Sequence, residues 1–251
     1  MKRGLLVIDR GSREQEAKDE LKEICARVKE KGSYEFSDFC FLEVLPPFIK
    51  DGIENSLNQE LDTLTIVPYF LYPGKKVKAA VTDAIKFQAT TDVKFIVSKP
   101  MSMHKTMIEL VENRVSTSLE ENNLKFPNNE VDVLIIGHGS KDPNAKLSIQ
   151  YVVDGLKSTY RNVDHCFLEI EEPNIQQGIT KSEKNNPKVL VIVFYFLHEG
   201  AHVKRDIYED LNPALEKSNL QKVLITKHIG TDEKMIDLII ERAKEVENAN
   251  Q

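Results

Sequence analysis

The segment FLEVLPPFIKDGI, residues Phe41–Ile53, recurs later in the chain as FLEIEEPNIQQGI, residues Phe167–Ile179. The two segments are identical at 7 of 13 positions, and the second begins 126 residues after the first. A second pair, VPYFLYPGKKVK at Val67–Lys78 and VFYFLHEGAHVK at Val193–Lys204, shares 7 of 12 residues at the same offset. Two matching pairs at one offset indicate an internal duplication, which has to be recognised before any fold is assigned.

The duplication divides the 251 residues into two tandem copies. Residues 121–130, ENNLKFPNNE, contain four Asn and one Pro, a composition typical of a linker between folded segments. We therefore predict an N-terminal lobe at residues 1–125 and a C-terminal lobe at residues 126–251.

Each copy contains four apolar runs that alternate with helical patterns, which is typical of parallel strands joined by crossover helices. The predicted strands lie near Gly4–Ile8, Phe36–Glu43, Leu64–Leu71, Val93–Val97, Val133–Ile136, Val163–Glu169, Val189–Leu197 and Val223–Thr226. Amphipathic spacing predicts two helices, one through Ala17, Leu21, Ile24, Cys25 and Val28, the other through Met235, Ile239, Ala243 and Val246. The predicted fold class is α/β, with two tandem lobes that each hold a four-stranded parallel sheet flanked by helices.

Composition excludes several classes of protein. Hydrophobic residues make up 41% and charged residues 29% of the chain, as in globular proteins. The longest apolar run, Val189–Leu197, is far shorter than the roughly 20 residues that cross a bilayer. The net charge of −6 argues against non-specific nucleic-acid binding. The three cysteines include no CxxC pair, so we expect buried thiols. We predict a cytoplasmic protein without a nucleic-acid or membrane partner.

The two copies differ in their histidines. The second copy carries His138, His198 and His202, where the first has Arg10, Tyr72 and Lys76. Residues that are needed only for folding should recur in both copies, as Glu169 does in Glu43. The unmatched histidines are therefore candidates for chemistry, whereas we expect structural roles for His104, His165 and His228.

The candidate residues follow neighbouring strands of the second predicted sheet. His138 follows its first strand, Glu169 ends its second, and His202 follows its third. Because ligands of open α/β sheets bind at the carboxyl ends of the strands, we expect these side chains to converge. Two imidazoles and a carboxylate form a metal site with open positions, suited to Fe²⁺, Co²⁺, Ni²⁺ or Zn²⁺.

Two further patterns lie near this site. His198 to His202 reads HEGAH and satisfies HExxH, the zinc motif of metalloproteases, but the motif requires a helix and here follows a long apolar run and contains Gly200. A basic cluster of Lys141, Lys204 and Arg205 adjoins the histidines. Such cations could receive the carboxylates of an anionic ligand.

Together, the strand followed by GHGS, the FLE-x-x-x-P segment and the YFL-x-x-G-x-H-V-K-x-D-I turn resemble the class II tetrapyrrole chelatases. These are sirohydrochlorin cobalt and iron chelatases of the CbiX, SirB and CbiK type. The resemblance covers nearly the whole chain as two copies. It implies the chelatase fold and the insertion of a divalent metal into sirohydrochlorin, for sirohaem or cobalamin biosynthesis.

The resemblance also implies roles for individual residues. His138, Glu169 and His202 match the family's metal-binding and catalytic positions, and His138 is the predicted principal base. The predicted substrate contacts are Lys141, Lys204, Arg205, Ser140 and Lys76. Fe²⁺, Co²⁺ and also Ni²⁺ are expected as the metal substrate, without an organic cofactor. A non-catalytic carrier of tetrapyrrole or metal on the same fold, and a zinc hydrolase using the HEGAH segment, remain as alternatives.

Overall fold

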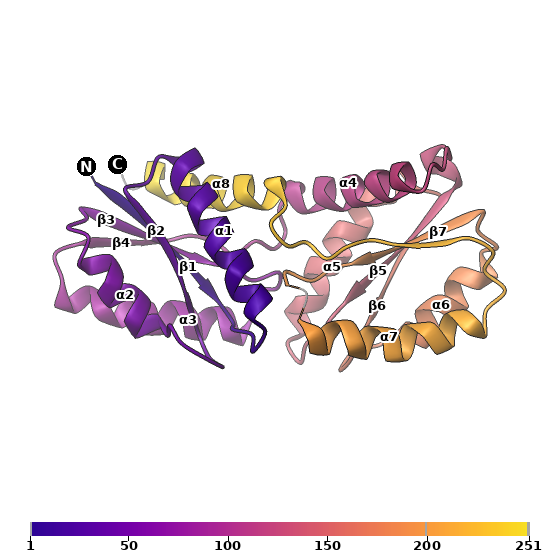
Figure 1. Ribbon diagram of the computed structural model, residues 1–251, viewed down its shortest axis with the longest axis horizontal. Helices are drawn as coiled ribbons and strands as arrows, with labels where there is room; N and C mark the ends of the chain where they lie inside the picture. The colour runs from indigo at the N-terminus through magenta and orange to yellow at the C-terminus, as the bar shows by residue number, and fades with distance from the viewer. Residues whose placement is uncertain (1, 199, 250–251) are drawn as a thin grey trace. The chain divides into compact units, whose positions relative to one another are not determined.

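The computed structural model of the chain (Figure 1) describes residues 2–198 and 200–249, and only the backbone of residues 201–204. The first copy contains β1 (Arg3–Asp9), α1 (Gln15–Gly32), β2 (Phe36–Phe41), α2 (Ile49–Leu57), β3 (Thr63–Pro68), α3 (Lys75–Ile85), the short 3₁₀ helix η1 (Lys86–Thr90), β4 (Lys94–Val97) and α4 (Lys105–Glu121). The second copy contains η2 (Asn128–Glu130), β5 (Val131–Gly137), α5 (Pro143–Leu156), β6 (Asn162–Phe167), α6 (Ile175–Lys184), β7 (Val189–Phe194), α7 (Ala201–Glu216), β8 (Val223–Ile225) and α8 (Glu233–Ala249).

The strands form two four-stranded parallel sheets of the same topology, in the orders β2-β1-β3-β4 and β6-β5-β7-β8. Of the four central strands, β3, β5 and β7 are buried along their whole length and β1 is buried except at Arg3, whereas the edge strands β4 and β8 are partly exposed. This difference follows from position in the sheet, because a central strand has neighbouring strands on both sides and helices over both faces, whereas an edge strand has one open side. The predicted α/β class with two four-stranded parallel sheets is confirmed.

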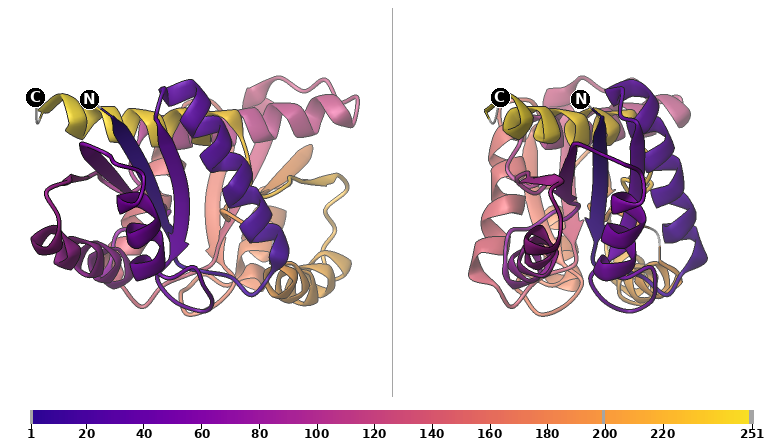
Figure 2. Two further views of the ribbon diagram at one scale, coloured as in Figure 1. Left: turned by 60° about the vertical axis from the view of Figure 1, so that its left-hand side comes forward. Right: turned by 90° about the vertical axis from the view of Figure 1, so that its left-hand side faces the viewer.

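Helices cover both faces of each sheet. In one compact unit, α1 and α8 lie on one face of the first sheet, while α2 and α3 lie on the other (Figures 1 and 2). In the other unit, α5 and α4 cover one face of the second sheet, and α6 and α7 cover the other. The final helix of each sequence copy, α4 or α8, therefore packs on the sheet that the other copy forms.

This exchange of helices corrects the predicted domain boundaries. The first unit comprises residues 1–102 and 231–251, and the second comprises residues 103–230. The predicted lobes, 1–125 and 126–251, describe the two sequence copies, but they assign α4 and α8 to the wrong sheets. The two helices occupy equivalent positions in the two copies, so the repeat pattern itself carries no information on which sheet each one covers.

The eight predicted strands are all present, with differences at their ends. The strands predicted to run to Leu71 and Leu197 end at Pro68 and Phe194, because the chain leaves the sheet there while still buried. All five residues of the predicted α1 stripe are buried. In α8 the stripe differs at its end, where Glu247 is buried and Val246 is only half-buried.

The cysteines agree with the expectation from composition. Cys25, Cys40 and Cys166 are buried free thiols, and burial raises their pKa, that of Cys166 to about 12. Of the helices in the described ranges, none combines the length and apolar character that a membrane crossing requires.

Candidate metal centre

The ends of β5 and β6 bring His138 and Glu169 together. The parallel pairing of these strands continues for two residues past β6, since the Leu168 amide donates to the Gly137 carbonyl (2.9 Å) and the Glu169 amide to the His138 carbonyl (3.1 Å). The backbone therefore holds residues 138 and 169 side by side at the carboxyl edge of the second sheet, as the sequence predicts.

Their side chains also meet. His138 Nε2 lies 3.3 Å from Glu169 Oε1, and the side chains are 33% and 56% exposed, so solvent and solutes reach the pair. The buried Phe196 ring packs edge-on against the imidazole at a centroid distance of 6.4 Å. An imidazole that is supported on one side and faces an accessible carboxylate can ligate a divalent ion, exchange protons, or do both in turn.

Gly139 allows the two loops to approach each other. Its φ is +91°, and a Cβ at this position would lie only 1.9 Å from the carbonyl oxygen of Glu169. Gly11 has the equivalent geometry in the first unit, with φ +107° and 2.1 Å to the carbonyl oxygen of Glu43. Only glycine tolerates this combination of backbone conformation and contact, which explains why both copies retain it.

We expect Gly139→Ala to destabilise the protein by at least about 2 kcal/mol and to weaken metal binding, because the Cβ pushes the Glu169 loop away from His138. Urea denaturation and Co²⁺ titration measure the two effects. Gly11→Ala is the matched control, with a similar loss of stability and unchanged metal affinity. Equal loss of metal affinity in both variants would contradict the assignment of the site to the second unit.

The third predicted ligand, His202, lies in the first turn of α7, as does Lys204. The side chains of both residues are outside the described part of the structure. Among the side chains that are described, no three His, Cys, Asp or Glu residues gather closely enough to hold a metal ion. The described centre is therefore the pair of His138 and Glu169, and the contribution of His202 stays a prediction.

The backbone around α7 argues against the zinc-hydrolase alternative. The helix begins at Ala201, and Gly200 precedes it in an extended conformation, with φ −72° and ψ 140°. His198 therefore lies outside the helix, whereas HExxH places both histidines on one helical face. Glu199, the base in that motif, lies outside the described residues.

The predicted substrate contacts have varied surroundings. Lys141 is exposed, and Arg205 lies 3.6 Å from both Asp206 and Glu209 on its own helix. The Ser140 hydroxyl accepts a hydrogen bond from the Asp142 amide (3.1 Å), as the hydroxyl of Ser12 does from the Glu14 amide in the first unit (3.2 Å). The serine thus has a structural role in both copies, and its contact with substrate stays a prediction.

In the first unit, two cations replace the histidines. Arg10 Nε lies 3.0 Å from Glu43 Oε1, and Lys76 Nζ lies 2.5 Å from Glu43 Oε2. Lys76, with a smaller contribution from Arg10, lowers the pKa of the Glu43 carboxyl below its usual value. The carboxylate that matches Glu169 is thus paired with fixed positive charges, and Lys76 already has a partner of its own.

Two of the other histidines have structural surroundings. His104 is the N-cap of α4 and accepts a hydrogen bond from the Thr106 amide. His165 lies within β6 with its ring against Phe167, and burial is the largest cause of its lowered pKa.

Sequence reasoning missed Glu171, whose carboxylate accepts a hydrogen bond from the Ser140 amide at 3.0 Å. The sequence does hold one indication of a special role for Glu171, because the residue in the same position of the first copy is Leu45.

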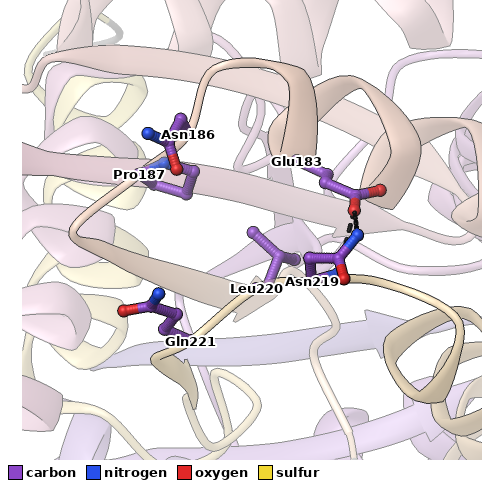
Figure 3. Close-up of a pocket in the computed structure, with 6 residues that line it drawn as sticks. All are labelled: Glu183, Asn186, Pro187, Asn219, Leu220 and Gln221. Atoms are coloured by element: carbon purple, nitrogen blue, oxygen red, sulfur yellow. Dashed lines mark hydrogen bonds between the residues drawn. The ribbon is translucent and has the colours of Figure 1, made fainter.

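A pocket of about 280 Å³ lies elsewhere in the second unit (Figure 3). Its lining residues are Glu183, Asn186, Pro187, Asn219, Leu220 and Gln221. Glu183 accepts hydrogen bonds from the backbone and side-chain nitrogens of Asn219, at 2.8 and 2.7 Å. These residues precede β7 and β8, so the pocket lies at the amino ends of the strands, opposite the edge that carries His138.

Comparison with known proteins bears on this centre. The CbiX family model matches residues 4–118 and again residues 132–246. A sirohydrochlorin cobaltochelatase of Priestia megaterium is 26% identical over 248 residues, covering 97% of this chain and 79% of the relative. A sirohydrochlorin ferrochelatase of the same organism is 22% identical over 244 residues, covering 96% and 89%. The structure of SirB from Bacillus subtilis with Fe³⁺ superposes with a TM-score of 0.85 at 22% identity, covering 100% and 98% of the two chains, which shows the same fold.

Proposed function

The chain belongs to the CbiX family of sirohydrochlorin chelatases, and from that membership we propose that it inserts Fe²⁺ or Co²⁺ into sirohydrochlorin. The observation that carries the proposal is the accessible pair of His138 and Glu169, 3.3 Å apart at the carboxyl edge of the second sheet. The family match spans both copies, whereas this pair exists in only one of them.

The metal ion is a substrate and has to leave the protein. His138 Nε2 and Glu169 Oε1 supply one nitrogen and one oxygen ligand, and we assign a third ligand to His202. A site with few protein ligands and open positions binds a divalent ion without enclosing it. Such an ion can exchange its remaining water ligands for the nitrogens of a tetrapyrrole.

Insertion of M²⁺ releases two protons from the pyrrole nitrogens, so the site needs a proton acceptor. Once the metal has moved to the macrocycle, His138 Nε2 is available to accept a proton, since a neutral imidazole serves as a ligand or as a base. Glu169 is within 3.3 Å and more than half exposed, so it can take the proton from His138 and pass it to water. One pair of residues thus serves both metal delivery and proton removal.

The acidic tetrapyrrole requires cations near this centre, although the chain carries a net charge of −6. We assign the contacts with substrate carboxylates to Lys141, Lys204 and Arg205, which adjoin the two histidines in the sequence, together with the loop of Ser140. Lys76 is the weakest of the predicted contacts, because Glu43 already binds its ammonium group.

The identity of the metal depends on more than the ligand set. Imidazole and carboxylate ligands accept Fe²⁺, Co²⁺ and Ni²⁺, and affinity alone favours the later members of this series. A relative named for cobalt and one named for iron each match nearly the whole chain at similar identity, so the proposal includes both metals. We also propose that the protein acts in the cytoplasm.

The decisive experiment supplies purified full-length protein with sirohydrochlorin and Fe²⁺, Co²⁺ or Ni²⁺ separately, without oxygen, and follows the absorbance of the macrocycle. We expect insertion of Fe²⁺ or Co²⁺ well above the rate without protein. Insertion of no metal above that rate overturns the proposal. Tight binding of sirohydrochlorin without acceleration supports the carrier alternative instead.

A further inference from the structure

The loops that follow β1 and β5 are stabilised in different ways. In the first unit, the buried Asp9 ends β1 and accepts a hydrogen bond from the Gly11 amide at 2.8 Å. The residue in the same position of the second unit is Gly137, which has no side chain. The loop that carries His138 therefore lacks the local carboxylate that stabilises its counterpart.

Glu171 supplies a carboxylate to this loop from the neighbouring strand end. Its Oε2 accepts from the Ser140 amide at 3.0 Å, and its own amide donates to the Glu169 carbonyl at 2.8 Å. The amide of the matching residue in the first unit, Leu45, also donates to a carbonyl, that of Glu43 (3.1 Å), but its side chain cannot accept a hydrogen bond. Like His138, Glu171 belongs to the second copy alone.

A second tie between the loops also differs. In the first unit the two loops are joined by Arg10 and Glu43, through side chains that stand in the positions of His138 and Glu169. In the second unit, the contact of His138 Nε2 with Glu169 Oε1 at 3.3 Å joins the same positions, but it has to open when these two atoms bind a metal ion. The bond from Ser140 to Glu171 joins the same two loops from an adjacent position and leaves the ligand pair facing each other.

The loop that Glu171 holds is a strained one. Ile170, between Glu169 and Glu171, has a φ of +73°, a conformation that is unfavourable for a β-branched residue and persists only where its surroundings enforce it. Val44, in the same position of the first unit, has a similar φ of +81°, and in both units the preceding Glu amide bonds to the neighbouring loop, Glu43 to the Arg10 carbonyl and Glu169 to the His138 carbonyl (both 3.1 Å). The bond from Ser140 to the Glu171 carboxylate adds a second tie to this turn in the second unit.

We propose that Glu171 is a positioning residue, which ties the loop of Glu169 to the loop of His138 and thereby sets the metal affinity of the centre. The inference rests on the proposed function for the identity of the site. Residues that orient metal ligands typically change metal affinity by about 10–100-fold when they are removed. Glu171 acts here as a hydrogen-bond acceptor, so its charge is dispensable.

The test compares Glu171→Leu, which introduces the residue of the first copy, with Glu171→Gln, which keeps an acceptor of the same length. Co²⁺ titration followed by visible absorbance gives the dissociation constant, and thermal unfolding reports the fold. We expect Glu171→Leu to weaken Co²⁺ binding about tenfold or more, and Glu171→Gln to stay within about threefold of the wild type. In the insertion assay, the KM for metal should rise more than kcat falls.

Glu172→Gln is the matched control, because Glu172 is an exposed neighbouring carboxylate without a bond to the His138 loop. If Glu171→Leu does not fold, Glu171→Ala removes the same acceptor without adding bulk.

Unchanged Co²⁺ affinity in Glu171→Leu or Glu171→Ala overturns the inference. An equal loss of affinity in Glu171→Gln also overturns it, because the charge of Glu171 would then be the important property. The titration needs no tetrapyrrole, so a wild type that binds Co²⁺ but inserts no metal refutes the proposed function alone. A wild type that binds no Co²⁺ overturns the positioning role as well.

Discussion

His138→Ala is expected to lower the rate of metal insertion into sirohydrochlorin by about a hundredfold to ten-thousandfold, the range typical of losing a general base. In the proposed mechanism, the variant loses a metal ligand and a proton acceptor at once, and it leaves Glu169 without the imidazole that it faces at 3.3 Å. Fold stability should change little, because the side chain is one-third exposed. Initial rates of insertion at saturating metal, with Co²⁺ titration of the same samples, measure the loss.

Arg10→Ala is the matched control for this variant, since Arg10 occupies the position of His138 in the first copy. It should leave the insertion rate within about threefold of the wild type and keep Glu43 paired with Lys76. A large loss of insertion in Arg10→Ala, together with a harmless His138→Ala, would transfer the centre to the first unit and refute the assignment.

Glu247→Leu is expected to destabilise the protein by about 3 kcal/mol, because it removes the acceptor from a buried polar network. Glu247 is 6% exposed on α8 and accepts from Arg3 (2.8 Å), the Tyr34 hydroxyl (3.0 Å) and the Thr65 hydroxyl (2.6 Å). Burial, and next the charge of Glu247, raise the pKa of Tyr34, so this hydroxyl remains a donor across the ordinary pH range. Thermal unfolding should show a Tm lower by about 6–12 °C.

The second unit provides the control for this network. Its residues in the positions of Arg3, Thr65 and Glu247 are Val131, Val191 and Leu119, all buried and apolar. The triple variant Arg3→Val, Thr65→Val and Glu247→Leu should regain most of the stability that Glu247→Leu alone loses, because no charged partner is left unpaired. A loss below about 1 kcal/mol in Glu247→Leu, or no recovery in the triple variant, would contradict this account. Co²⁺ affinity should be unchanged throughout.

The same network gives a physical reason for the exchange of the two final helices. On the first sheet, α8 places its carboxylate beside Arg3 and Thr65. On the second sheet, the matching position of α4 holds Leu119, and the matching strand residues are valines. The opposite assignment would bury Glu247 against apolar strands and leave Arg3 and Thr65 without an acceptor, which costs free energy on both sheets. Amphipathic spacing is alike in the two helices, whereas these contacts differ between them.

The candidate metal centre, like the fold, could be predicted from the sequence only in part, because some of its features depend on tertiary contacts. The pairing of His138 with Glu169 could be predicted, because carboxyl ends of adjacent parallel strands meet at one edge of a sheet. The proposed role of Glu171 could not be predicted, because it depends on a hydrogen bond between two loops. These loops come close only because Gly139 has no Cβ to clash with the Glu169 carbonyl. Nor does spacing predict that Lys76 is held by Glu43.

The amino-acid sequence by itself determined the eight strands, the two parallel sheets and the copy that carries the histidines, since these follow from local apolar patterns and from the differences between two repeats. Only the tertiary structure decided which sheet each final helix covers and which polar groups tie the loops of the centre together. The reason is that these features depend on how single polar side chains, distant in the sequence, are paired or left unpaired once they are buried.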